Sequence, residues 1–127
     1  MIVGIGVDMV SVARLAAALE RHPGMARRVF AAAELVGQPS TESLAGSFAA
    51  KEALVKALGS ATGGTLIDIA VTHDGDGAPS LTLNGAVRAR AEERGVVRSH
   101  LSISHDGGMA IAMVVLEGAV PPPIEEV

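Results

Sequence analysis

Three charged side chains, Lys51, Glu52 and Lys56, interrupt a mostly apolar run from Phe48 to Leu58. On a helical wheel Lys51 falls inside the apolar stripe, where burying its ammonium group is costly unless the group finds an anionic partner. Glu52 and Lys56 are four residues apart, in the order that favours a helical ion pair. The run predicts either ordinary surface electrostatics with a snorkelling lysine or a set of charges that meets an anionic ligand.

A further carboxylate, Asp8, ends an alternating stretch near the N-terminus. In a strand over Ile2–Asp8 the apolar side chains share one face, and Gly4, Gly6 and Asp8 share the other. Two glycines on one face indicate close approach by another element or a ligand. Asp8 could meet a cation or ligand there, or cap the following helix. A dinucleotide fingerprint is excluded, because Met9 stands where its third glycine would be.

Two other segments carry groups suited to phosphate. The loop over 60–65 is rich in glycine and hydroxyl groups and could offer backbone N–H groups to an anion, although an ordinary loop has the same composition. It lacks the Gly-Lys-Ser/Thr ending of a P-loop, so that motif is rejected. His105 precedes a turn at 106–108, where a histidine could donate to phosphate or simply cap the loop.

Four arginines, Arg14, Arg21, Arg27 and Arg28, lie within fifteen residues, on a chain whose net charge is −4. They predict a local basic surface that could dock a negatively charged partner, and the alternative is a solvated helix face. The negative net charge argues against general nucleic-acid binding.

Composition bounds the class of protein. The chain has 127 residues, enough for one domain, and 49% are hydrophobic, with two Phe, no Trp and no Tyr. The lack of cysteine excludes disulfides, thiolate chemistry and cysteine metal sites. The longest apolar run, Met109–Leu116, is too short to cross a bilayer, and no basic and apolar leader opens the chain. We therefore expect a soluble, cytoplasmic protein without membrane contacts.

The remaining pattern predicts the elements that must position these groups. Helices are expected over 11–21, Met25–Val36, 41–58 and 84–94. Strands are expected over Ile2–Asp8, Leu66–Thr72, Ser80–Leu83, Leu101–His105 and Met109–Leu116, the last four as two hairpins. The central helix should be capped by Ser40 or Thr41 and end at Gly59. We expect one domain over 1–118 and an extended or disordered tail over 119–127.

Three separated segments occur in the order found in one family: the strand Gly4-Ile5-Gly6-Val7-Asp8, the helical run Phe48-Ala49-Ala50-Lys51-Glu52-Ala53 with Lys56, and the segment Ser102-Ile103-Ser104-His105-Asp106. Together they resemble the holo-acyl-carrier-protein synthase type of 4′-phosphopantetheinyl transferase, over residues 2–116. The resemblance implies an α+β fold, with a small antiparallel sheet packed against a long central helix.

The resemblance also implies an activity. The family transfers the 4′-phosphopantetheine arm of coenzyme A to a serine of an acidic acyl carrier protein, releasing adenosine 3′,5′-bisphosphate, and requires magnesium. The resemblance implies a place in fatty-acid biosynthesis and lipid metabolism, and the sequence leaves open a carrier of polyketide or peptide synthesis. A non-catalytic module that holds coenzyme A or a carrier protein, and a structural trimer whose charges only bridge subunits, are the alternatives.

Roles follow residue by residue from the matched motifs. Asp8 and Glu52 would be the protein ligands of Mg²⁺, an oxygen-rich set that suits this ion. Lys56 would contact the phosphates and protonate the leaving bisphosphate, and Glu52 or a metal-bound water would take the serine proton. Cofactor contacts are implied for Lys51, Lys56, Gly59, Gly63, Gly64, Thr65, Ser104 and His105.

The family forms homotrimers with active sites between subunits, so Asp8 and His105 would face Glu52 and Lys56 of an adjacent chain. Carrier-protein contacts are implied for Arg14, Arg21 and Arg28, and more weakly for Arg27. One departure stands out: Ser47 occupies a position where the family commonly has arginine. We therefore expect one phosphate contact fewer here.

Overall fold

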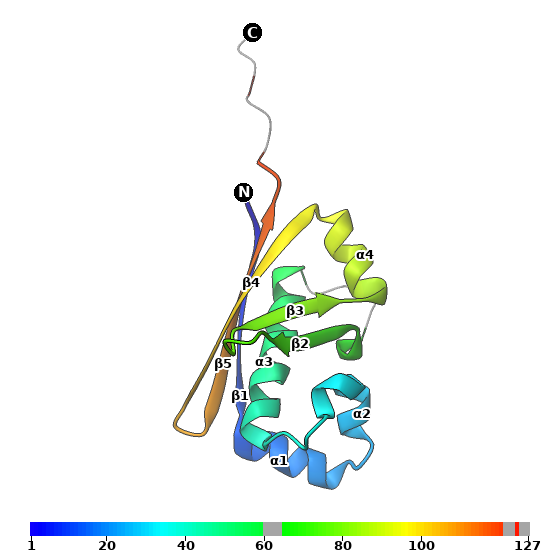
Figure 1. Cartoon of the computed structure of the whole chain (residues 1–127), viewed down its shortest axis with the longest axis vertical. Helices are drawn as coiled ribbons and strands as arrows, with labels where there is room; N and C mark the ends of the chain where they lie inside the picture. Colours follow the sequence, from blue (N-terminus) through cyan, green and yellow to red (C-terminus); the bar gives the residue numbers. More distant parts are fainter. Residues whose placement is uncertain (60–64, 121–123, 125–127) are drawn as a thin grey trace.

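The computed structural model describes residues 1–59, 65–120 and 124. Figure 1 shows a sheet on one side, a long helix lying against it, and smaller helices at both ends of that helix. The strands are β1 (Ile2–Ser11), β2 (Ile69–His73), β3 (Pro79–Leu83), β4 (Val96–Asp106) and β5 (Met109–Gly118). The helices are α1 (Val12–Arg21), α2 (Met25–Val29), η1 (Ala32–Leu35), α3 (Thr41–Ala57), η2 (Leu66–Asp68) and α4 (Gly85–Glu93), the two η elements being 3₁₀ turns.

The main sheet is antiparallel, with the strand order β1-β5-β4, and β2 and β3 form a separate hairpin. Because β5 is the central strand, its inward side chains are covered completely, and Ala112, Val114 and Leu116 are fully buried. They pack against small and branched residues of α3, including Ala53 and Leu54. The predicted arrangement of an antiparallel sheet against a long central helix is confirmed.

The two glycines of β1 explain how closely the sheet approaches α3. A Cβ atom added to Gly6 would lie 1.9 Å from the carbonyl oxygen of Ala53, and one added to Gly4 would lie 2.1 Å from that of Ala57. Only glycine permits this contact. The expected close approach on the glycine face is confirmed, and the neighbour is α3.

The opposite face of the sheet is apolar and uncovered. Ile5, Val7 and Met9 of β1 are 60%, 56% and 58% exposed. In the strand register Val7 lies opposite Met113 and Met9 opposite Ile111, and both partners on β5 are also exposed. We call Ile5, Val7, Met9, Ile111 and Met113 the outer face. Such a patch of large apolar side chains is typical of an interaction surface.

Two strands are longer than predicted, because β1 continues to Ser11 and β4 already begins at Val96. Two other elements differ in kind. The helix expected over Met25–Val36 is broken into α2 and η1, because the extended backbone at Phe30 turns its ring into the core, where it is fully buried. The strand expected over Leu66–Thr72 begins with η2 instead. There the amide of Asp68 donates to the Thr65 carbonyl and the Thr65 amide donates to the Asp68 carboxylate.

Other expectations hold. Ser40 caps α3, accepting from the Ser43 amide, and Gly59 follows the helix with a φ of +88°. Both predicted hairpins are present. The predicted tail falls mostly on 121–123 and 125–127, which lie outside the described residues. Among the described helices, none is long and apolar enough to cross a membrane.

Candidate active site

Asp8 and Glu52 line one cavity of about 300 Å³ beside α1. Asp8 shares the glycine face of β1, so the strand alternation that turns Gly4 and Gly6 toward α3 also turns this carboxylate toward α3. It does not cap the following helix, because Ser11 does so, accepting from the Arg14 amide. The structure therefore excludes the predicted cap, and the Asp8 carboxylate pairs with Lys56 of α3 instead.

Lys56 reaches the same carboxylate. Its Nζ lies 2.8 Å from Asp8 Oδ1 and donates to the Val7 carbonyl at 3.1 Å. The lysine side chain is 54% exposed and that of Asp8 20% exposed. An ion pair this open contributes about 1 kcal/mol at most. The pair matters for the chemistry of the site, because it places the exposed Lys56 ammonium group near the carboxylates of Asp8 and Glu52.

The pKa of Glu52 is changed by its burial and by the charges beside it. Burial raises the pKa of Glu52 above its usual range, the nearby charge of Asp8 raises it further, and Lys56 partly opposes the change. Two carboxylates that repel each other at the mouth of a cavity fit a divalent cation, which would relieve both charges. No cluster of three or more acidic or histidine ligands occurs in the described part of the chain. A cation held here would therefore draw its other ligands from the substrate and water.

Lys51 has a different role from the one expected. Its side chain is fully buried and donates to Glu34 Oε1 at 2.6 Å and to the Val29, Leu66 and Ile69 carbonyls. Three N–H groups thus face four acceptors within the chain. This corrects the cofactor contact expected for Lys51, because its ammonium group is occupied in the core and its anionic partner is Glu34.

His105 lies in a second cavity, of about 190 Å³. Its Nε2 donates to the Glu42 carbonyl at 2.8 Å, and its ring lies against Gly46, where a Cβ would be 3.1 Å from Nε2. Ser104 is opposite Ile111 and shares the outer-face side of the sheet, whereas His105 is turned toward α3. The two neighbours therefore cannot contact one ligand atom from within a single chain.

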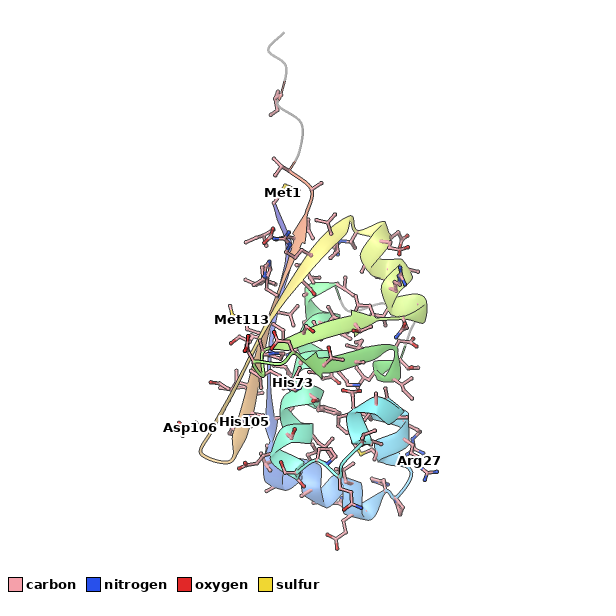
Figure 2. The ribbon with its side chains drawn as sticks, in the orientation of Figure 1. Met1, Arg27, His73, His105, Asp106 and Met113 are labelled. Carbon is pink, nitrogen blue, oxygen red and sulfur yellow. The ribbon has the colours of Figure 1, made fainter. Side chains whose placement is uncertain are left out.

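The expected division of the site between chains needs a correction. Asp8 does not require an adjacent subunit to meet Glu52 and Lys56, because the close packing of β1 on α3 brings all three together in one chain. His105 is the group that lines a separate cavity. Figure 2 shows His105 beside Asp106 near the β4–β5 turn, and His73 farther from that turn.

Comparison with known proteins identifies the family. The family model described as the 4'-phosphopantetheinyl transferase superfamily matches residues 4–114. The chain belongs to this superfamily. It is 54% identical to a protein of Clavibacter sepedonicus named holo-[acyl-carrier-protein] synthase, over 93% of this chain and 98% of the relative. The three segments matched in the sequence are thus those of a phosphopantetheinyl transferase.

Solved structures agree on the fold. The crystal structure of holo-ACP-synthase from Plasmodium yoelii superimposes with a TM-score of 0.85 at 29% identity, covering 94% of this chain and 98% of that one. The Helicobacter pylori holo-[acyl-carrier-protein] synthase, solved in complex with coenzyme A, gives a TM-score of 0.80 at 33% identity, covering 89% and 99%. The α+β fold and the transferase class predicted from the sequence are confirmed.

The other residues expected at this transferase's site lie in different parts of the chain, and two of them fall outside the described residues. Thr65 precedes η2, and Gly59 follows α3. Gly63 and Gly64 lie outside the described residues. Ser47 is nearly buried and lines the cavity of His105.

The arginines divide between two helices of the transferase. Arg14 lines the carboxylate cavity from α1, and Arg21 lies in the last turn of that helix. Arg27 and Arg28 lie in the last turn of α2, and Figure 2 shows Arg27 at the edge of the molecule away from the main sheet. All four are exposed.

Sequence reasoning missed His73, which lines the cavity of His105. It lies at the end of β2, before the turn of the hairpin, and a histidine at a strand end carries little signal by itself. Reasoning also missed the apolar wall of the carboxylate cavity, formed by Leu15, Met25 and Phe48. Its members come from three helices, so no local pattern unites them.

Proposed function

We propose that the chain transfers the 4′-phosphopantetheine arm of coenzyme A to a serine of an apo acyl carrier protein, giving holo carrier protein and adenosine 3′,5′-bisphosphate. The observation that carries this proposal is the shared cavity of Asp8 and Glu52 with Lys56 at its edge. The names of the relatives and the coenzyme A complex of one of them support it. We place the reaction in the cytoplasm and in fatty-acid biosynthesis.

The proposed metal is Mg²⁺, held by Asp8 and Glu52 with phosphate oxygens and water completing the shell. When bound, it offsets negative charge on the pyrophosphate and on the transition state. Burial raises the pKa of Glu52 most, and repulsion by Asp8 raises it further; such a cation would remove that repulsion. This is the support for magnesium within the chain.

The residues then have separate tasks. The serine oxygen forms a bond to the phosphorus that carries the pantetheine arm, and the bond from that phosphorus to the bridging oxygen of the pyrophosphate breaks. The serine proton passes to Glu52 or to water in the cavity, and Lys56 gives a proton to the departing bisphosphate. Lys56 suits this task because its exposed ammonium group can exchange Asp8 for a phosphate oxygen.

We propose that the nucleotide portion meets His105, Ser104, Thr65, Gly59 and the glycines at 63 and 64. His105 lines a different cavity from the carboxylates, so a second copy would have to supply it. The apolar outer face supports such an assembly, because five large side chains from β1 and β5 are exposed together. We therefore propose a homotrimer with the nucleotide bound between subunits.

The carrier protein is proposed to dock on α1 and α2. Arg14 lies at the cavity of the reacting groups and Arg21 and Arg28 extend the basic surface from it. Carrier proteins are acidic, and complementary charge steers an acidic partner and fixes its orientation.

A mass-shift assay tests the proposal. Purified protein, coenzyme A, Mg²⁺ and a panel of apo carrier proteins should give one added phosphopantetheine per carrier in the mass spectrum. E52Q should lose turnover by about two orders of magnitude or more and E92Q, an exposed glutamate on α4, should not. A non-catalytic module would bind coenzyme A and leave every carrier mass unchanged.

A further inference from the structure

The proposed reaction does not use the most deeply buried charges of the molecule. Lys51 and Glu34 form an ion pair of 2.6 Å, with side chains 0% and 3% exposed. Burying two charges costs desolvation energy that their attraction often only offsets, so net stabilisation alone is a weak reason for such a pair. The role of the pair is therefore sought in the segments that its two side chains hold together.

The two side chains connect five elements, namely α2, η1, α3, η2 and β2. Besides Glu34, Lys51 Nζ reaches the Val29 carbonyl at the end of α2 at 2.8 Å, together with carbonyls of η2 and β2. Glu34 accepts from the Ala31 amide at 2.9 Å and from the Val71 amide at 3.2 Å. The chain from α2 to η1 is thereby tied both to α3 and to β2.

α2 is a short helix that is held at both of its ends. It has five residues, no side-chain cap and no buried residue. Met25 at its start packs against the cluster of Leu15, Ala45 and Ala110. At its C-terminal end the Val29 carbonyl accepts from Lys51, and Phe30 enters the core. The Lys51 ammonium group also lies 5.3 Å from the centre of the Phe30 ring, a cation–π distance. Arg27 and Arg28 are carried by this same last turn.

We infer that Lys51 and Glu34 are positioning residues for carrier-protein docking. By fixing the end of α2, the pair holds the guanidinium groups of Arg27 and Arg28 in one orientation toward the acidic partner. Preorganised charge binds better than charge that must be ordered during docking. The inference rests on the proposed function and assigns Lys51 to the carrier step, not to coenzyme A.

Steady-state kinetics with K51M distinguish the two assignments. The KM for the carrier protein should rise about three- to tenfold, while the Kd of coenzyme A measured by calorimetry should stay within about twofold. A weakened coenzyme A affinity with an unchanged carrier KM would overturn the inference. E34Q keeps the volume of Glu34 and should give the same pattern, so the test survives if K51M does not fold. R88Q, which removes an exposed pair on α4, is the control.

A double-mutant cycle separates positioning from general loosening. If Lys51 acts through Arg27 and Arg28, then K51M in an R27Q/R28Q background should raise the carrier KM no further. Additive effects on the carrier KM would overturn the inference. A wild-type protein that modifies no carrier would instead refute the proposed function itself, so the two failures are distinguishable.

Discussion

Lys56 Nζ lies 2.8 Å from Asp8 Oδ1, so the ammonium group on α3 is directed across to β1. The helical pair expected between Lys56 and Glu52 is thus replaced by a pair between two elements. Because Asp8 is also a proposed metal ligand, Lys56 and the cation compete for the same carboxylate.

K56M should therefore have two effects. Turnover should fall by about 10²- to 10⁴-fold through loss of the proton donor. The Mg²⁺ concentration at half-maximal rate should fall as well, because Asp8 no longer has an internal cation. Initial rates over a Mg²⁺ series measure both. Unchanged turnover would contradict the proposed role of Lys56.

D8N should abolish the effect of Mg²⁺ on the folded protein. We expect Mg²⁺ to raise the melting temperature of the wild type, because a cation that binds only the folded state stabilises it, and to leave that of D8N unchanged. Differential scanning fluorimetry over a Mg²⁺ series measures this. D76N, in an exposed turn, is the matched control. An equal Mg²⁺ response in D8N would exclude Asp8 as a ligand.

The pH dependence of stability follows from Glu52. Its pKa is raised mainly by burial and then by Asp8, so the folded state binds its proton more tightly than the unfolded state does. This contribution is present below the usual glutamate pKa and is lost as the pH rises through the higher folded value. E52Q should therefore melt higher than the metal-free wild type at neutral pH, and the two should converge in acid. A lower melting temperature for E52Q at neutral pH would contradict this account.

The contact between β1 and α3 predicts a large effect of one methyl group. G6A should lower the free energy of unfolding by about 3 kcal/mol or more, because the new Cβ would overlap the Ala53 carbonyl oxygen at 1.9 Å. G75A has open space around the new Cβ and should be nearly neutral. Urea unfolding followed by circular dichroism compares the two. If G6A and G75A had equal free energies of unfolding, then β1 could move away from α3 without a loss of stability.

The outer face predicts the behaviour of the assembly. V7K should convert the proposed trimer into monomers and remove activity, because a lysine charge would be placed among apolar side chains. V36K replaces a valine that directly follows η1 and is 79% exposed, and it should leave the oligomeric state and the activity unchanged. Light scattering coupled to size-exclusion chromatography gives the mass. A V7K protein that stays trimeric would show that the outer face is not the subunit interface.

Local chemistry predicted much of this molecule. The cap at Ser40, the glycine after α3 and both hairpins are encoded within a few residues, and they are found where expected. The meeting of Asp8 and Glu52 also had a signal, since a glycine face indicates a close neighbour. The pairing of Lys51 with Glu34 had no such signal. Periodicity placed Lys51 on the buried side of its helix, but Glu34 is seventeen residues away in the sequence. The two side chains meet because the chain is extended at Phe30, between α2 and η1.

Long-range geometry accounts for the remaining errors. Alternation in β1 divided its residues correctly between two faces, yet it could not say that the apolar side would be the uncovered one. Nor could spacing show that His73 and His105 would line one cavity, because β2 and β4 belong to different sheets.

The glycines that bring β1 against α3 also leave that strand with few apolar side chains to bury inside its own chain. Ile5, Val7 and Met9 all point away from the core. In the proposed trimer these side chains would leave water on contact between subunits, a gain of about 1.5 to 3 kcal/mol for each one that is fully covered. By mass action, the melting temperature should rise with protein concentration, so dilution alone should weaken the fold.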